Sequence, residues 1–251
     1  MRSGRWLPLL SATALLATWA AAVWWLAIPG HVAPSPLAVV QTLWHDAGTL
    51  SVNLTTTVIE SVAGFLLGNL AAVLLAIAFV QKRSVQDAFL PIAALVNTTP
   101  IVAIAPILAL LLGNDMSPKI AIAALVCFFP TLVNMVRGLS SVNPRSLELM
   151  HILAASDYEV LFKLRLPNSL PYLFASLRIA TSTAMIGAIV GEWIGSTAGL
   201  GALIIQAMRN SDTPLMFASV VLASTFSATF FFLIGCLERR VVTWAAAVGA
   251  A

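Results

Sequence analysis

The sequence predicts an all-α, polytopic membrane protein. Apolar residues make up 60% of its 251 residues, charged residues make up only 9%, and long apolar runs recur along the chain. A soluble domain usually carries about 25% charged residues. The composition therefore excludes a soluble enzyme, a disordered protein and a nucleic-acid binder. The net charge of +3 comes from few residues and predicts no nucleic-acid partner.

Six segments are apolar and long enough to cross a bilayer, which takes about 20 helical residues. They are residues 7–28, 54–80, 88–112, 120–136, 173–194 and 214–237. Membrane β-strands are excluded because the segments are too long and do not alternate with a period of two. The first segment exceeds a signal-peptide core and carries Trp24 and Trp25, which suit a membrane interface. We therefore expect it to remain as a transmembrane helix.

Basic residues predict how these helices are oriented. If the N-terminus is cytoplasmic, eleven Lys and Arg residues fall on the inside and only Lys119 and Arg209 on the outside. Cytoplasmic loops carry such an excess of basic residues. We therefore expect both chain termini to be cytoplasmic.

The longest inner loop, residues 138–172, is patterned like helices. Its apolar residues recur at helical spacing, with Pro144 near the start and Pro167 and Pro171 expected to end the loop. A loop of this length is more than a connector needs. It is either an amphipathic segment on the membrane surface or a docking element for a cytoplasmic partner.

A motif with fixed spacing favours docking. The loop reads Glu148-Leu149-Met150, three residues, Ala154, nine residues, Leu164, one residue, Leu166-Pro167. This resembles the EAA loop of bacterial ABC-importer permeases, whose pattern is Glu-Ala-Ala, three residues, Gly, nine residues, Ile, one residue, Leu-Pro. Every spacing is kept, with four substitutions.

The resemblance extends over about residues 30–240. Further stretches similar to the permease family for nitrate, sulfonate, taurine and related solutes are Pro34-Ser35-Pro36, Gly64-Phe65-Leu66-Leu67-Gly68, Phe129-Pro130, Leu170-Pro171-Tyr172, Gly191-Glu192 and Gly199-Leu200-Gly201. The resemblance implies a type I importer permease of the MetI-like fold with six transmembrane helices, in the bacterial plasma (inner) membrane. Such a permease crosses the membrane several times and is surrounded by the lipid bilayer.

The implied organisation has four parts. Residues 1–30 hold the first transmembrane helix, and residues 31–53 form an outer loop with a short amphipathic helix. Residues 54–240 form the permease core, including the coupling loop 138–172, and residues 241–251 form a cytoplasmic tail. A short helix near Leu153–Phe162 is the implied coupling helix, seated in a groove of a separate ATPase subunit.

The resemblance also implies partners and site residues. The partners are two ABC ATPase subunits, a second permease subunit that is expected to be a copy of this chain, and an extracytoplasmic solute-binding protein. Gly64 and Gly68 match small-xxx-small packing, so the second and fifth segments are the expected dimer interface. The residues expected to couple to the ATPase are Glu148, Ala154, Ala155, Ser156, Asp157, Glu159, Leu166 and Pro167.

The chain is not expected to be an enzyme. A Walker loop needs Gly-Lys followed by Ser or Thr, and no Gly-Lys occurs in the sequence. No cofactor is expected on this chain, since ATP and Mg belong to the partner ATPase. No catalytic or metal-binding residue is expected either, because no two of the three histidines have metal-ligand spacing.

Polar residues inside the apolar segments are candidates for the translocation path. Glu60 and Glu192 are either interfacial and hydrated, or they line the outer cavity or brace the gate. The run Asn97, Thr98, Thr99 before Pro100 indicates either a tolerated kink or a pore-facing polar patch. Phe128 either belongs to a hydrophobic gate or packs against the core.

The solute is less constrained by the sequence. Sulfonate and taurine permeases typically carry Arg-Pro-Ile-Pro-Pro where this chain has Asn97–Ile101, and Glu60 replaces an Arg frequent in them. The pattern instead resembles the family members for thiamine-pyrimidine precursors, riboflavin or similar heterocycles. Carboxylates on the path would also repel an anion, which favours a small neutral, zwitterionic or weakly cationic solute such as a nitrogen heterocycle. The alternative is a nitrate, alkanesulfonate or taurine importer. A self-contained secondary transporter or channel is a different class, for which an inverted repeat would be expected and is not seen.

Overall fold

The computed structural model describes residues 6–244, and every regular element in that range is a helix. The helices are α1 (Leu7–Trp25), α2 (Pro36–His45), α3 (Ala47–Gln81), α4 (Arg83–Thr98), α5 (Ile101–Leu112), α6 (Met116–Ser140), α7 (Pro144–Ile152), α8 (Asp157–Val160), the π-helical turn η1 (Leu161–Arg165), α9 (Leu166–Glu192), α10 (Leu200–Arg209) and α11 (Thr213–Val241).

Four helical elements of the described chain are long and apolar enough to cross a membrane. They are α3, α6, the continuous element Asp157–Glu192 and α11, and the bent pair α4 and α5 makes a fifth if it counts as one span. The helix α1 has 19 residues, shorter than these four. The multi-pass membrane architecture is confirmed, whereas the count of six spans stays a prediction.

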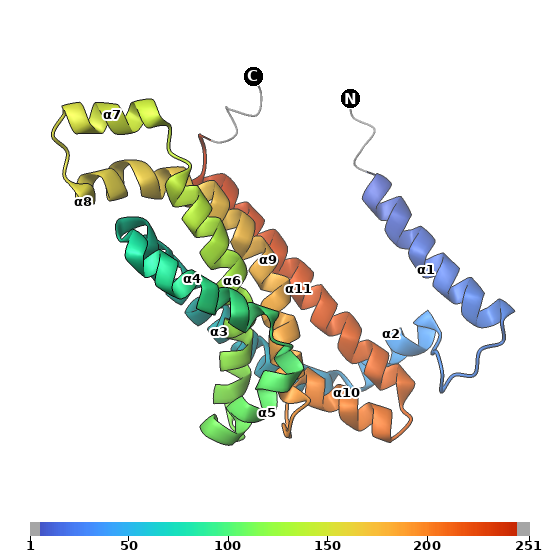
Figure 1. Cartoon of the computed structure of the whole chain (residues 1–251). Coiled ribbons are helices and arrows are strands. Elements are labelled where there is room, and N and C mark those ends of the chain that lie inside the picture. The colour runs from blue at the N-terminus through green and yellow to red at the C-terminus, as the bar shows by residue number, and fades with distance from the viewer. Residues whose placement is uncertain (1–5, 245–251) are drawn as a thin grey trace.

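The long helices cross between two ends of the molecule. Figure 1 shows α7 and α8 at one end, together with the C-terminal ends of α6 and α11, while α2 and α10 lie at the opposite end. The helix α1 stands apart from the other long helices in this view, although Trp19 stacks on Phe217 of α11 with ring centroids 5.8 Å apart. We call these the α7 end and the α10 end.

The apolar segment predicted over residues 88–112 is two helices rather than one. The chain bends by 102° between α4 and α5, where Thr99 and Pro100 leave the helical conformation. Pro100 has no N–H for a helical hydrogen bond and disfavours the helical conformation of Thr99 before it. A tolerated kink is therefore too weak a description, because the direction of the chain changes almost at a right angle.

Small residues bring α3 and α9 close to α6. A Cβ on Gly64 would overlap the Ala123 side chain, one on Gly68 would overlap the Ala124 backbone, and one on Gly187 would lie 2.8 Å from the Ala123 Cα. These glycines allow the backbones to approach closely inside one chain. Gly64 and Gly68 therefore serve packing inside the chain, against α6, and the dimer interface expected at the second and fifth segments stays a prediction.

Pro167 and Pro171, which were expected to end the inner loop, both lie within a helix. They lie at the start and inside α9, which continues without a break from α8 and η1. A proline removes one helical hydrogen bond and crowds the preceding turn, and the π-helical turn η1 lies directly before Pro167. One helical element of 36 residues, about 54 Å long, therefore joins the α7 end to the α10 end.

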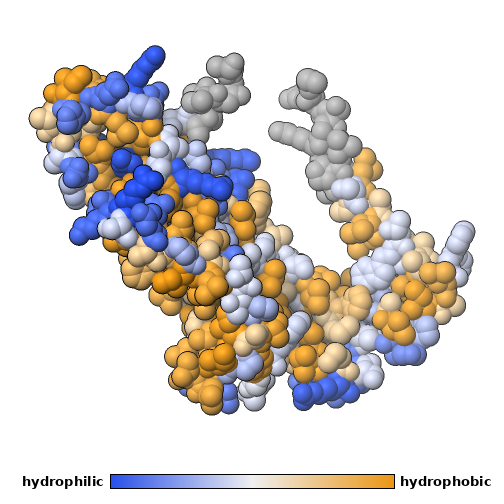
Figure 2. All heavy atoms as spheres, in the orientation of Figure 1, coloured by the Kyte–Doolittle hydropathy of each residue, from blue (hydrophilic) through white to orange (hydrophobic). Residues whose placement is uncertain are grey.

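The surface matches this architecture. Figure 2 shows hydrophobic residues over much of the visible face, including part of α1, and hydrophilic residues gathered mainly around α7, α8 and the start of α4. A hydrophobic band between two polar ends suits a chain that spans a bilayer.

Candidate functional site

The residues predicted to couple to an ATPase lie around the turn between α7 and α8. Glu148 is exposed on α7, Ala154 and Ala155 lie in the turn, and Ser156 is the N-cap of α8. Asp157 and Glu159 belong to α8, whereas Leu166 and Pro167 lie two turns further on, in the first turn of α9. The structure therefore gathers the first six residues and leaves the last two at the base of the loop.

The predicted coupling helix Leu153–Phe162 is wrong in its first part. Leu153 to Ser156 form a turn, and Ala154 adopts a left-handed conformation with φ of 51°. This conformation is costly for residues with a Cβ and free for glycine, which the EAA pattern has at this position. The helix begins only at Asp157, where Ser156 and Glu159 form a reciprocal capping box.

The sequence did not single out the exposed apolar side chains around this turn. Leu149, Ile152, Leu153, Tyr158 and Phe162 are all at least 49% exposed, and the Tyr158 and Phe162 rings lie 4.3 Å apart. We call these five residues the apolar patch. Exposed apolar patches of this kind mark interaction sites. Leu149, Ile152 and Leu153 are spaced i, i+3 and i+4, and Tyr158 and Phe162 are four residues apart, so periodicity alone does not tell whether these side chains are buried or exposed.

The loop is fixed to the end of α6. The Arg165 guanidinium donates to the Leu139 carbonyl at 2.9 Å, and the Asn168 amide donates to the Gly138 carbonyl at 3.2 Å. Within the loop, Lys163 pairs with Glu159 at 2.7 Å. The patch therefore sits on a supported element rather than on a free connector.

At the α10 end, three side chains accept hydrogen bonds from the backbone N–H groups at the start of α10. Asn53 accepts from the Gly199 N–H at 2.8 Å, Thr57 from the Leu200 N–H at 2.8 Å, and Glu192 from the Gly201 N–H at 2.5 Å. The Thr57 hydroxyl also donates to the Glu192 carboxylate at 2.6 Å. A carboxylate near the N-terminus of a helix is favoured by the helix dipole. We call these residues the α10 clamp.

Two glycines make room for this carboxylate. A Cβ on Gly199 would overlap the Glu192 carboxyl group, and one on Gly201 would lie 2.5 Å from the Ile189 carbonyl oxygen. Gly199 also has a φ of 105°, which side chains rarely tolerate. The Gly199-Leu200-Gly201 motif is thus explained by the approach of Glu192 rather than by loop flexibility.

Glu60 and Glu192 are not hydrated interfacial residues, since each is 1% exposed. Their carboxyl groups are neighbours, and Lys119 acts on both as a positive charge. Lys119 is 2% exposed, and its ammonium donates to the Asn114 and Asp115 carbonyls at 2.5 and 2.6 Å. The expectation that the pair repels anions from an open path therefore loses its basis, because the carboxyl groups are enclosed beside a cation.

Asn53, Thr57 and Lys119 were missed as site residues. Asn53, Thr57 and Glu60 are four and three residues apart, which places them on one face of α3. The polar face of α3, together with the Gly191-Glu192 and Gly199-Leu200-Gly201 motifs, could have indicated that Asn53 and Thr57 belong to the site. Nothing in the sequence indicated that Lys119 is a site residue, because an isolated Lys near the start of an apolar segment is typical of a loop.

The polar run before the bend lines a cavity. Asn97, Thr98 and Thr99 border a space of about 320 Å³ together with residues of α5, α6 and α9. The two threonine hydroxyls donate to the Leu95 carbonyl at 2.8 and 3.2 Å. Phe128 instead packs against a buried cluster of α3 and α6 and borders a second cavity of about 320 Å³. The structure thus brings the polar run to a cavity beside α5, whereas Glu192 borders a different cavity of about 490 Å³ at the α10 end.

The arrangement has counterparts among solved structures. The chain superimposes on the inward-facing MetNI methionine ABC transporter with a TM-score of 0.59, covering 83% of this chain and 98% of that one at 19% identity. At this identity the likeness establishes the fold alone.

Sequence comparisons identify closer relatives. The chain is 36% identical to a probable ABC transporter permease protein of Haemophilus influenzae, covering 94% of this chain and 96% of the relative. It is 33% identical to the riboflavin transport system permease protein RibX of Chloroflexus aurantiacus, covering 92% and 87%. It is 32% identical to the formylaminopyrimidine transport permease protein ThiX of Halalkalibacterium halodurans, covering 85% and 86%.

Residues 64–243 match the family described as the inner membrane component of binding-protein-dependent transport systems. This range contains the bend, the apolar patch and Glu192 of the α10 clamp, whereas Asn53 and Thr57 precede it. The chain belongs to this family and is a multi-pass permease subunit of an ABC importer in the inner membrane.

Proposed function

We propose that this permease carries a small nitrogen heterocycle across the membrane and is driven by a separate ATPase that docks on the apolar patch. The observation that carries the proposal is the 36-residue element Asp157–Glu192, which starts within the patch and ends in the α10 clamp. A continuous helix moves as one body, so displacement at one end reaches the other.

Docking is proposed at the turn between α7 and α8. Ala154, Ala155 and Ser156 present small side chains, which permit close approach of a partner, and Leu153 and Tyr158 beside them are 66% and 67% exposed. Glu148, Asp157 and Glu159 supply negative charge that basic residues of the ATPase would complement. Two ATPase subunits, one for each of two permease copies, would bind ATP and Mg, and the α7 end would be cytoplasmic.

The opposite end is proposed to receive the cargo. With the α7 end in the cytoplasm, α2 and α10 face the outside, where an extracytoplasmic solute-binding protein would dock. Glu192 is proposed to brace this end rather than to touch solute, since both of its carboxylate oxygens are engaged in the clamp.

The path is proposed to pass the polar run at the bend. Asn97, Thr98 and Thr99 offer amide and hydroxyl groups without charge, which suits a neutral solute that forms hydrogen bonds. Two relatives above 30% identity are named for riboflavin and for formylaminopyrimidine, both nitrogen heterocycles. The uncharged polar run and the two named relatives support a nitrogen heterocycle as the cargo. Repulsion of anions by Glu60 and Glu192 does not support it, because both carboxyl groups are buried.

A solute panel tests the proposed cargo. In the complex of permease, ATPase and cognate binding protein, we expect riboflavin or formylaminopyrimidine to stimulate ATP hydrolysis several-fold, whereas taurine and nitrate leave it at the basal rate. The measurement is phosphate release in proteoliposomes at saturating solute. Stimulation by taurine or nitrate alone would replace the heterocycle by an anion and leave the ATPase coupling in place.

A further inference from the structure

A cavity with aromatic walls extends from the bend between α4 and α5 toward the start of α4. Its volume is about 320 Å³, and its walls come mainly from α4 and α6. Among the described residues that line it, none is charged. Six of them occupy the facing sides of the two helices: Phe89, Val96 and Asn97 of α4, and Leu125, Phe128 and Phe129 of α6. We call this space the aromatic cavity.

The cavity exists because α4 packs loosely on its neighbours. None of the residues of α4 is buried. Phe89, Val96 and Asn97 are seven and eight residues apart, which places them on one face of the helix over about 12 Å. Ligand pockets usually measure about 300–1,000 Å³ and are mostly apolar with a few polar groups. The aromatic cavity is at the small end of this range, which suits a small ring system.

Two phenylalanine rings in its walls are available for stacking. Phe89 is 52% exposed and Phe129 is half-buried, and neither ring pairs with another ring or with a cation within residues 6–244. Phe128 is less available, because it packs against the buried cluster of α3 and α6. Aromatic side chains stack on the flat faces of heterocyclic bases. The walls of the cavity therefore suit a flat ring.

Asn97 supplies a polar group that lacks a partner. The neighbouring Thr98 and Thr99 hydroxyls donate to the Leu95 carbonyl, whereas the Asn97 amide has no hydrogen-bond partner in the described part of the chain. It borders both the aromatic cavity and the cavity beside α5. An amide away from water is costly without a hydrogen bond. A side-chain amide pairs with a heterocycle edge on which a donor and an acceptor are adjacent.

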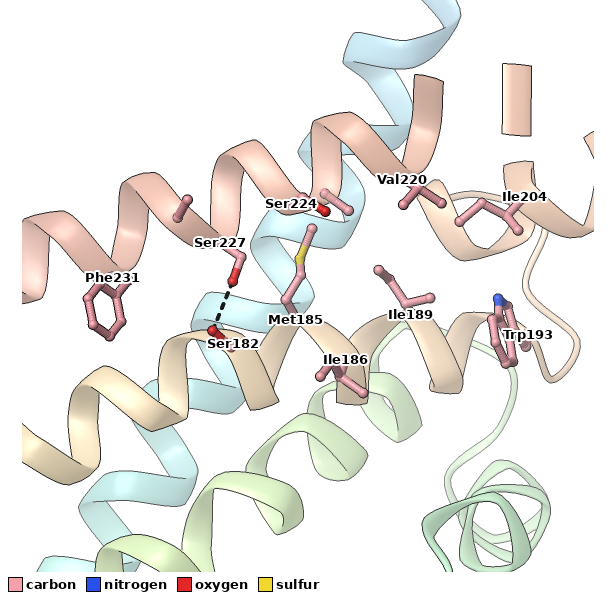
Figure 3. A pocket seen from close by; sticks show the side chains of 12 residues that line it. Ser182, Met185, Ile186, Ile189, Trp193, Ile204, Val220, Ser224, Ser227 and Phe231 are labelled. Carbon is pink, nitrogen blue, oxygen red and sulfur yellow. Dashed lines mark hydrogen bonds between the residues drawn. The ribbon is translucent and has the colours of Figure 1, made fainter. Parts of the chain in front are cut away.

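A larger apolar groove between α9 and α11, of about 630 Å³, is the alternative place for a ring (Figure 3). There Ser227 donates to Ser182 at 3.3 Å, and the Arg178 guanidinium lies 5.5 Å from the centroid of the Phe231 ring. These groups already have partners within the chain. None of the residues that line the groove carries a side-chain amide. The groove therefore lacks the combination of free rings and free amide found in the aromatic cavity.

We propose that the aromatic cavity binds the heterocyclic ring of the cargo, with Phe89 and Phe129 against its faces and Asn97 hydrogen-bonded to its polar edge. This rests on the proposed function, in which the cargo passes the polar run. Asn97 is then a specificity-determining residue, because an alkanesulfonate or nitrate has neither a flat ring nor such an edge. Since Asn97 borders both cavities, a solute that moves from one to the other keeps this contact.

Equilibrium binding of riboflavin to the permease–ATPase complex in lipid nanodiscs, without the binding protein, tests the proposal. The readout is the anisotropy of the fluorescence of riboflavin itself, and formylaminopyrimidine should compete. Asn97→Leu keeps the size of the side chain and removes the amide, while Phe129→Leu keeps the apolar packing and removes the flat ring. We expect each to raise the Kd about tenfold. Phe129→Trp should bind at least as tightly as the wild type.

The matched control is Phe231→Leu, the same change in the wall of the groove between α9 and α11 (Figure 3). It should leave both the Kd and the basal ATP hydrolysis unchanged. Variants are compared only if they co-purify with the ATPase, which shows that they are folded. Weaker binding in Phe231→Leu but not in Phe129→Leu would place the ring in the groove and overturn the proposal.

Two further outcomes separate this proposal from the proposed function. Equal riboflavin binding by the wild type, Asn97→Leu and Phe129→Leu, or no binding by any of them, would overturn the aromatic cavity as the site. If riboflavin still stimulates ATP hydrolysis in the solute panel, the proposed function then stands. Stimulation by taurine or nitrate alone would overturn both the heterocyclic cargo and its site.

Discussion

Replacing Ala155 with arginine is expected to abolish transport while leaving membrane insertion intact. Ala155 is half-buried in the turn between α7 and α8, and its N–H donates to the Met150 carbonyl at 3.0 Å. A long charged side chain would add bulk and an unpaired charge to the proposed docking surface. We expect at least a tenfold loss of affinity for the ATPase, about 1.4 kcal/mol, measured by co-purification and by ATP hydrolysis of the complex.

Ala154→Gly is the control for this variant. It changes the neighbouring residue, removes the left-handed strain at φ of 51° and adds no bulk, so transport should be retained and the turn slightly stabilised. Wild-type transport by Ala155→Arg would show that this residue does not pack in the ATPase groove. Equal loss in both variants would indicate that the turn simply fails to fold.

Replacing Thr57 with valine is expected to abolish transport from the opposite end. Valine has nearly the shape of threonine but leaves the Leu200 N–H and one Glu192 oxygen without their partner. Each buried group left unpaired costs about 1–3 kcal/mol. The purified protein should unfold at a lower temperature and lose transport, while ATPase association at the distant α7 end should persist.

Thr57→Ser keeps the hydroxyl and is the matched control, so it should retain most of the transport rate. Glu192→Gln should resemble Thr57→Val, because the amide nitrogen that replaces one carboxylate oxygen cannot accept a hydrogen bond. If Thr57→Val and Thr57→Ser transport equally well, the clamp does not hold the outer end during transport. Loss of ATPase association in Thr57→Val would contradict a defect confined to the α10 end.

The sequence was sufficient to predict the long helices, because a run of about 20 apolar residues leaves few alternatives in a bilayer. The sequence was not sufficient to predict whether a helix bends or continues at a proline. Pro100 is followed by a 102° change of direction, whereas Pro171 lies inside a continuous helix. The same residue type gives either outcome, since the neighbouring helices decide whether the freed backbone groups find other partners.

The location of the proposed docking site was predictable because a motif of fixed spacing marks it, but the turn at Leu153–Ser156 was expected to be helical. The glycine position of the motif corresponds to the left-handed Ala154. The α10 clamp was only partly predictable. Glu192 and Gly199 were noticed separately, but their contact joins residues more than 130 positions from Asn53 and Thr57. Such contacts depend on how helices pack, and periodicity within one helix carries no information about them.

ATP hydrolysis with the two partners on opposite sides of the membrane tests the two-ended arrangement most directly. The permease with its ATPase is reconstituted in proteoliposomes, with cargo-loaded binding protein sealed inside and ATP supplied outside. Only complexes whose α7 end faces outward then hydrolyse ATP, and their α10 ends face the binding protein. We predict several-fold stimulation in this arrangement and basal hydrolysis when ATP and binding protein are both outside. Stimulation with both on the same side would contradict the assignment of ATPase coupling and cargo entry to opposite ends of the element Asp157–Glu192.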